Sequence, residues 1–427
     1  MNVERAKPAL NPDAAAARRR RMMPAAKPLP EIVEQHGEEA AFLWAQRDRA
    51  VRAPHYNLTL LDRLDERVEA HVDGLRVAGD LGWEIATAAL SPDQPGGFFS
   101  AAALAFDSRD VARIQKVVEA ASPEPAASRA LASALAWLPW KRSEAVVKPW
   151  LESPSAPLRR LAVAAFALHR KDPGPPLLKA VGDPDAAVRA RAFKALGELG
   201  LVGRLPLAQR AVGDPDPGVA FAAAWSTALL SKDAGPLIGI ISKDLGRAGR
   251  GISLAVRRSD ASWARALPPR LAILAAGHAG DPAAVPWLLE QMKTPALARV
   301  GGEAFSMITG SEFEYENLEG AAPEGFEAGP TDDAKDENVD LDPDEDLPWP
   351  KIDAVQKWWE ARKGGIRAGA RHLLGKPIEA VSLQRILREG KQRSRAAAAL
   401  ELAIAAPGKP LFEVRAPGFR QKAAVGA

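Results

Sequence analysis

The fold of this chain is decided by residues 177–196, LLKAVGDPDAAVRARAFKAL, and residues 207–229, LAQRAVGDPDPGVAFAAAWSTAL. Each stretch contains a short apolar helix, a turn built on proline and a second helix rich in alanine. A third copy precedes them, and the turn prolines Pro154, Pro184 and Pro215 are 30 and 31 residues apart. A helix pair that recurs at this period is typical of an α-solenoid, in which neighbouring pairs stack to bury their apolar faces.

The turns and the small residues of the repeat both have a predicted structural role. Asp183 is expected to accept hydrogen bonds from free amides at the start of the second helix, and Pro184 fits a first helical turn, where no amide donor is needed. Asp185 suits the positive end of the helix dipole. Alanines recur three or four residues apart on each second helix, so that a neighbouring helix can approach closely. They are Ala162, Ala165, Ala192, Ala195, Ala222 and Ala223.

The motif GDPD at residues 182–185, followed by Val188 and Arg189, resembles a HEAT-type repeat. A further copy occupies residues 280–308, and its end, ITG at residues 308–310, is similar to an uncharacterised family of proteobacterial HEAT-repeat proteins. The resemblance covers most of residues 30–406 and implies an armadillo-like helical fold. It also implies a context, because such proteins are sometimes encoded beside type VI secretion components. The other residues that carry it are Asp73, Gly74, Leu75, Gly82, Trp83, Trp358, Trp359, Gly369, Arg371, Gly375 and Pro377.

Composition and periodicity divide this all-α chain into six predicted parts. Its centre is a HEAT-like solenoid of stacked helical pairs, with helical caps at both ends, an acidic disordered linker and two basic tails. The parts are residues 1–29, a disordered basic tail that includes Arg18–Arg21; 30–79, an N-terminal helical cap; 80–310, the repeat solenoid; 311–348, an acidic flexible linker; 349–406, a C-terminal helical cap; and 407–427, a loose basic tail.

Charge is strongly polarised near the carboxyl end. Residues 311–348 contain 15 acidic side chains and a single base, Lys335, whereas residues 349–427 contain 16 Lys and Arg against 6 Asp and Glu. We expect the acidic segment to be flexible, since it has no apolar period to bury. Two roles remain open for it: a plain tether, or a segment that folds back on the basic cap or on the repeat arginines and competes with a partner.

The sequence contains no recognisable catalytic set. There is no cysteine, which removes disulfides, thiolate catalysis and cysteine-based zinc sites, and the six histidines are scattered. Phosphate-binding glycine loops, paired zinc-binding histidines and nucleophile elbows are absent. No catalytic residue, cofactor or metal ligand is therefore predicted. Because no apolar run approaches about 20 residues and the amino terminus is charged, a soluble cytoplasmic protein without membrane insertion is expected.

Seven side chains are candidate partner-binding residues. Arginines at the start of second helices should line up along one solenoid face, where they either bond an aspartate of the neighbouring turn, forming a ladder, or bind an acidic ligand. Trp358 and Trp359 are about 100° apart on a helix, so only one of them can face a given contact, and Trp359 is our choice. The arginines are Arg159, Arg160, Arg189, Arg191 and Arg299.

These features together predict a non-catalytic HEAT-repeat scaffold or adaptor that binds a protein partner, and the resemblance implies that it is accessory to a bacterial secretion system. The alternative is a HEAT-like DNA-binding protein or DNA glycosylase that grips nucleic acid with a basic concave face.

Overall fold

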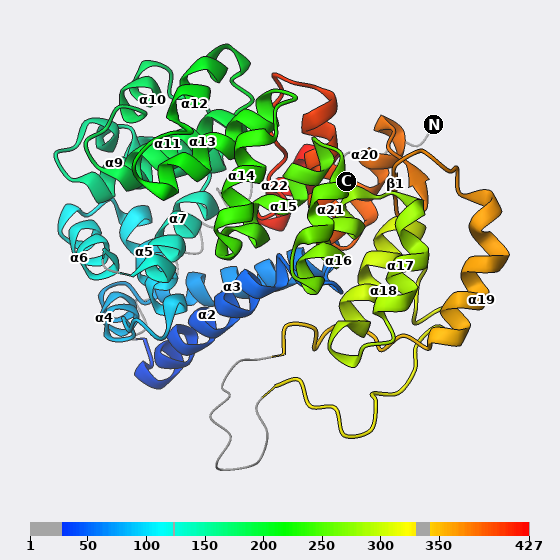
Figure 1. The fold of residues 1–427 in the computed structure, drawn as a ribbon. Coiled ribbons are helices and arrows are strands. Elements are labelled where there is room, and N and C mark those ends of the chain that lie inside the picture. Colours follow the sequence, from blue (N-terminus) through cyan, green and yellow to red (C-terminus); the bar gives the residue numbers. More distant parts are fainter. Residues whose placement is uncertain (1–27, 123, 330–341, 427) are drawn as a thin grey trace, which may run out of the picture.

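A computed structural model describes residues 28–122, 124–329 and 342–426 (Figure 1). Nearly all regular structure in these residues is helical, and successive helix pairs stack in chain order, which confirms the predicted α-solenoid. The predicted basic tail at the amino terminus, with Arg18–Arg21, lies almost entirely outside the described residues. None of the helices in the described ranges combines the length and the hydropathy needed to cross a bilayer.

The second helices of the pairs form one continuous layer, in which each packs on the next. Their apolar residues form a core that is shared between repeats, in which Val188 and Val219 are completely buried together with Leu177 of a first helix. Burial of each such side chain contributes about 1.5–3 kcal/mol. The layer consists of α5 (Pro95–Ser108), α7 (Pro125–Trp137), α9 (Ala156–Leu168), α11 (Ala186–Glu198), α13 (Pro217–Leu230), α15 (Ala248–Arg257), α16 (Pro269–Ala279) and α18 (Pro295–Thr309).

Shorter first helices and 3-10 turns connect the members of this layer. The first helices are α4 (Asp80–Ala88), α6 (Val111–Ala121), α8 (Trp140–Val147), α10 (Pro175–Ala180), α12 (Leu205–Ala211), α14 (Gly235–Lys243) and α17 (Val285–Gln291). The 3-10 turns are η1 (Pro149–Glu152), η2 (Val202–Arg204), η3 (Leu245–Arg247), η4 (Ala261–Ala266) and η5 (Pro282–Ala284), and one more, η6 (Lys363–Gly365), follows the layer.

The repeat helices begin two residues later than the turn motif predicts. Asp185, rather than Asp183, is the N-cap of α11, and its side chain accepts a hydrogen bond from the Val188 amide at 3.0 Å. Asp216 caps α13 in the same way. Pro184 consequently precedes the helix, and the buried carboxylate of Asp183 accepts from the amide of the N-cap residue Asp185 at 2.9 Å.

The close approach of α11 (Ala186–Glu198) to α13 (Pro217–Leu230) depends on a glycine. A Cβ atom added to Gly197 would lie 2.6 Å from the Ser226 hydroxyl, so glycine is required where α11 crosses α13. The same hydroxyl donates to the Phe193 carbonyl at 2.7 Å, which ties the two helices together.

The amino-terminal pair consists of α2 (Pro30–Ala50) and α3 (Leu58–Val77). The Asn57 side chain caps α3 by accepting from the Leu60 amide at 2.9 Å, a role for which asparagine is well suited. Helix α2 packs on α3, α4 and α5 and so joins the first end of the solenoid.

The acidic linker predicted over residues 311–348 is not a free tether in its described parts, residues 311–329 and 342–348. Phe313 and Leu318 are buried against the core of α16 to α18, and Leu347 is also buried. The Leu318 carbonyl accepts from the Lys351 amide at 2.7 Å. The acidic composition concealed these few apolar anchors, which hold the segment in place because each buries its side chain on folding. Residues 330–341 lie outside the described ranges.

The carboxyl-terminal region contains helices and one small antiparallel sheet, in which His372 pairs with Pro377 and Leu373 with Lys376. This hairpin was not predicted. The elements are α19 (Ile352–Arg362), β1 (His372–Leu373), β2 (Lys376–Pro377), α20 (Ala380–Glu389), α21 (Gln392–Ala405) and α22 (Gly418–Val425). We call residues 366–426 the C-terminal segment.

Residues 407–426 of the C-terminal segment are not the loose tail that the sequence predicts, because they include α22, which packs on α3. The C-terminal segment contacts the two ends of the solenoid at once: the Gln392 amide donates to the Tyr56 carbonyl at 2.7 Å, and Arg393 pairs with Glu303 of α18 at 2.6 Å. Helix α21 also packs on α13 and α15, and α22 packs on α3 (Figure 1). The solenoid therefore curves around this segment, which occupies its concave side.

Hydrogen bonds explain why a basic segment lies there. The last four carbonyls of a helix have no partner within the helix, and its carboxyl end favours positive charge. Arg420 donates to the Ala136 carbonyl of α7 and the Leu168 carbonyl of α9, both at 2.7 Å. The Leu411 amide donates to the Glu198 carbonyl of α11 at 2.9 Å.

The later second helices end in the same way. Arg371 donates from Nε to the Ala279 carbonyl of α16 at 2.8 Å. The Leu374 amide donates to the Met307 carbonyl of α18, also at 2.8 Å. Five second helices thus have their carboxyl ends capped by donors of the C-terminal segment.

These contacts predict that Arg420→Met lowers the free energy of unfolding by about 2–4 kcal/mol, since it leaves two helix-terminal carbonyls without their donor. Urea unfolding followed by circular dichroism measures this. Lys409→Met is the matched control, because Lys409 is exposed in the same segment, and it should change the free energy by less than about 0.5 kcal/mol. Equal effects of the two substitutions would contradict the capping role.

Candidate functional site

Arg159 and Arg189 join each repeat to the next. Arg159 donates from Nε and Nη2 to the two carboxylate oxygens of Asp183, at 2.6 and 2.8 Å, and its third nitrogen binds carbonyls of its own turn. Arg189 makes the equivalent ion pair with Asp214 at 3.3 Å. The hydrogen bond from Arg159 lowers the pKa of Asp183 below its usual value. The predicted ladder is confirmed for these two arginines, which are therefore engaged within the solenoid.

The candidate residues near the carboxyl end of the solenoid are buried. Arg299 is 7% exposed and donates to Asp342 at 2.5 Å and to the Asp344 carbonyl at 2.9 Å. Trp358 and Trp359 pack against Phe305 and are 9% and 7% exposed. Neither tryptophan offers the partner surface expected from the sequence, because the folded acidic segment and α19 close over this end of the core.

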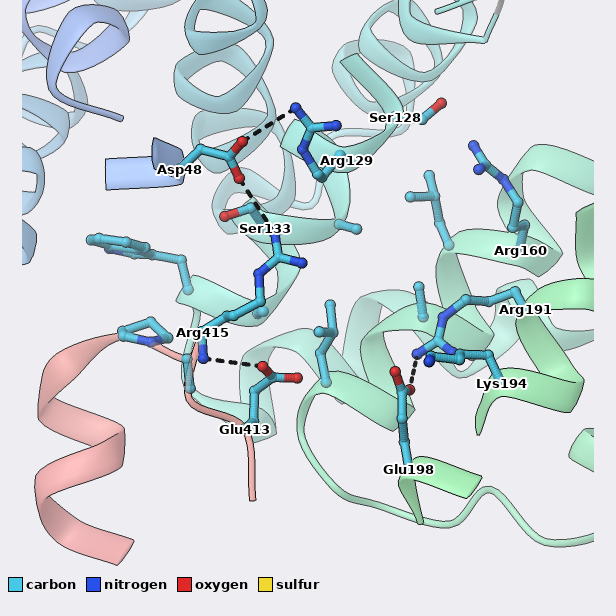
Figure 2. Close-up of a pocket in the computed structure, with 18 of the residues that line it drawn as sticks. Asp48, Ser128, Arg129, Ser133, Arg160, Arg191, Lys194, Glu198, Glu413 and Arg415 are labelled. Atoms are coloured by element: carbon cyan, nitrogen blue, oxygen red, sulfur yellow. Dashed lines mark hydrogen bonds and ion pairs between the residues drawn. The ribbon is translucent and has the colours of Figure 1, made fainter. Parts of the chain in front are cut away.

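Arg160 and Arg191 instead line a cavity of about 300 Å³. The walls are single faces of α7, α9 and α11, the end of α2, and residues 413–420 of the C-terminal segment (Figure 2). Three carboxylates, those of Asp48, Glu198 and Glu413, face a larger number of cationic side chains in this lining. The cations are Arg47, Arg129, Arg160, Arg191, Lys194, Arg415 and Arg420.

Three of these arginines occupy equivalent positions in consecutive repeats. Arg129, Arg160 and Arg191 are each 31 residues apart and lie on α7, α9 and α11. We call them the arginine stripe. Arg129 was missed at the sequence level because its repeat diverges from the other copies, although the spacing of 31 would have identified it.

Several cations of the lining already have partners. Arg47 pairs with Asp65 at 2.9 Å and also donates to carbonyls of the C-terminal segment. Arg129 and Arg415 share the carboxylate of Asp48 at 3.2 and 3.4 Å. These groups fix the walls of the cavity.

The remaining cations are undercompensated. Arg160 makes no hydrogen bond or ion pair with any described residue, and burial lowers its pKa. Arg191 pairs with Glu198 through Nη2 at 2.7 Å, whereas its Nη1 atom is buried without a partner among the described residues.

Lys194 lies beside this pair with its Nζ over the ring of Trp225. Burial lowers the pKa of Lys194 to about 7; Glu198 opposes the shift, and Arg191 and Arg170 reinforce it. For Glu198, burial acts to raise the pKa, but Arg191, Arg170 and Lys194 outweigh burial and lower it. The cavity thus carries more positive charge than its carboxylates balance.

The chemistry available in the cavity is the binding of an anion. The hydroxyls of its two serines are engaged, because Ser128 donates to the Ala121 carbonyl and Ser133 accepts from the Trp44 indole. Within the described ranges, no group of three or more His, Asp or Glu side chains is placed to hold a metal ion. Arginine forks are well suited to carboxylate or phosphate oxygens.

Removal of the Lys194 charge is predicted to stabilise the protein in neutral and weakly acidic solution. Between about pH 7 and 10.5 the unfolded chain retains a proton that folded Lys194 releases, so the free energy of unfolding of the native chain rises with pH across this window. At pH 6, the free energy of unfolding of Lys194→Met should exceed that of the native chain by about 1–3 kcal/mol. The variant should also lack the rise of this free energy with pH.

Urea unfolding at pH 6, 7.5 and 9 measures both effects. Lys179→Met, whose side chain is 74% exposed on α10, is the control and should keep the pH slope of the native chain. A Lys194→Met slope equal to that control would show that the ammonium is fully hydrated in the folded protein.

Comparison with known proteins identifies one similarity. A family model for HEAT repeats matches residues 144–228, which extend from α8 to α13 and include Arg160, Arg191 and Lys194. No curated protein and no solved structure matches the chain. The secretion-linked family suggested by the sequence therefore stays a prediction, and residues 144–228 form a HEAT-repeat region.

Proposed function

We propose that this protein is a non-catalytic HEAT-repeat scaffold that binds a protein partner. HEAT repeats present extended surfaces that commonly serve this purpose, and the repeat region here is built on a continuous stack of helix pairs. The observation that carries the proposal is the undercompensated charge of Arg160 and Arg191 on the concave side of that region.

The partner group that fits this site is acidic. Arg160 has no partner among the described residues, and Arg191 has one unused terminal nitrogen. Both lie one or two residues from ladder arginines, on a different face of the helix, so they are available without loss of the repeat contacts. A short acidic segment of a partner would supply the missing negative charge.

The alternative, a DNA-binding protein or DNA glycosylase, needs an open basic concave face. Here the C-terminal segment lies on that face, and Arg47 and Arg420 donate to backbone carbonyls. A duplex has one phosphate charge per about 1.7 Å along its length and would require many contacts in a row. The geometry favours a compact acidic group over nucleic acid.

The resemblance noted in the sequence supports a narrower part of the proposal, a role accessory to a type VI secretion system. Affinity purification of the full-length protein from its native organism, followed by mass spectrometry, tests both the partner and its identity.

We predict that Arg160→Glu/Arg191→Glu reduces recovery of the specific partner at least tenfold, since two attractive charges become repulsive. Arg204→Glu/Arg210→Glu is the matched control, because both arginines are exposed on η2 and α12, away from the cavity. Circular dichroism of each variant checks that it folds.

Equal recovery by the two double variants would remove the cavity from the binding surface. Recovery that disappears after nuclease treatment, together with a DNA mobility shift that weakens steeply with salt, would favour the nucleic-acid alternative instead.

A further inference from the structure

The undercompensated cations lie on one side of the cavity, and the cations that share the Asp48 carboxylate lie on the other. Figure 2 shows Arg160, Arg191 and Lys194 on one side of the space, and Arg129 and Arg415 around Asp48 on the opposite side. The side with the undercompensated cations is formed by two consecutive HEAT helices, α9 and α11. An occupant would therefore meet positive charge from several directions.

The carboxylates of the lining do not cancel this charge. Glu198 is engaged by Arg191 at 2.7 Å, and Glu413 is engaged by Arg170 at 3.0 Å. Asp48 is shared by Arg129, Arg415 and also Arg52. Arg160 and Lys194 are left without a carboxylate bonded to them among the described residues.

We infer that the cavity is a binding site for a phosphoryl group. The carboxylate of an acidic residue carries one charge on two oxygens, whereas a phosphoryl group carries about 1.5 to 2 charges and offers three strong acceptor oxygens. The site offers three separate cationic donors, which are Arg160, the unpartnered nitrogen of Arg191 and Lys194. They match the three oxygens of a phosphoryl group better than the two oxygens of a carboxylate.

The size and the walls of the cavity agree with this ligand class. A volume of about 300 Å³ is at the lower end of the range, roughly 300–1,000 Å³, that small-molecule sites occupy. Leu161, Ala164 and Leu168 of α9 supply an apolar wall beside the cations. Such a wall suits the carbon atoms to which a phosphoryl group is attached.

The site is shared between the repeats and the C-terminal segment, so its occupant bridges the two. Arg160 and Arg191 come from the repeats, whereas Glu413, Arg415 and Arg420 come from the segment. A ligand that binds only when both walls are in place stabilises the folded state by mass action. Phosphoryl binding should therefore raise the thermal midpoint of the whole protein.

The phosphoryl group has two possible sources, a free phosphate compound or a phosphorylated side chain of the partner, and in the second case the inference rests on the proposed function. Inorganic phosphate probes the shared chemistry with no partner present. Succinate and chloride at equal ionic strength and pH 7 are the comparison anions.

The full-length protein is expected to show a midpoint several degrees higher in phosphate than in succinate or chloride, and calorimetric titration should detect phosphate binding. Arg160→Gln/Lys194→Gln should weaken that binding at least tenfold. Arg204→Gln/Arg210→Gln, with two exposed charges removed elsewhere, should bind as the native chain does. Equal midpoints in the three anions, or equal affinity of the two double variants, would overturn the inference.

Phosphatase treatment of the cell extract before affinity purification separates the sources. Loss of the partner assigns the phosphoryl group to the partner, whereas unchanged recovery together with phosphate binding assigns it to a free compound. Unchanged recovery without phosphate binding overturns the phosphoryl site and leaves the scaffold proposal standing. Phosphate binding without any arginine-dependent partner overturns the scaffold proposal and leaves the phosphoryl site standing.

Discussion

The structure depends on one requirement, that the carboxyl ends of the second helices find hydrogen-bond donors. These helices run in one layer, so their unpaired carbonyls gather along one edge, where the helix dipoles also favour positive charge. The C-terminal segment meets both needs with backbone amides and with Arg371 and Arg420. Because these donors come from one continuous segment that also touches α3 and α18, capping of single helices fixes the curvature of the entire solenoid.

Arginines that join neighbouring repeats lie one or two positions along the helix from arginines that line the cavity. Arg159 and Arg160 are adjacent, and the helical step of about 100° turns the first toward Asp183 of the next turn and the second toward the cavity. The same division recurs at Arg189 and Arg191, two residues apart. The repeat thus carries two parallel rows of positive charge, one that holds neighbouring repeats together and one that lines their concave side.

The local features of the fold could be predicted from the sequence, and the long-range features could not. Proline spacing, the Asn57 cap and the Arg159 ladder follow from residues within one repeat period. The position of the C-terminal segment was missed because its donors are useful only where the helix ends gather, up to 284 residues away along the chain, as in the hydrogen bond that Arg420 donates to the Ala136 carbonyl. A basic stretch with little apolar periodicity is typical of a solvated tail, and nothing local distinguishes it from a capping segment.

The candidate site was also only partly predictable from the sequence, because only the wall formed by the repeat helices has a periodic sequence pattern. Arg160 and Arg191 were identified as a stripe, but the cavity exists only because residues 413–420 face them. Packing does not require an undercompensated charge at such a place: a buried cation without a partner costs free energy, and a neutral side chain of similar length would avoid that cost. Half-buried Arg160, which has no bonded partner among the described residues, is therefore better explained by a ligand that restores the balance of charge than by the stability of the solenoid alone.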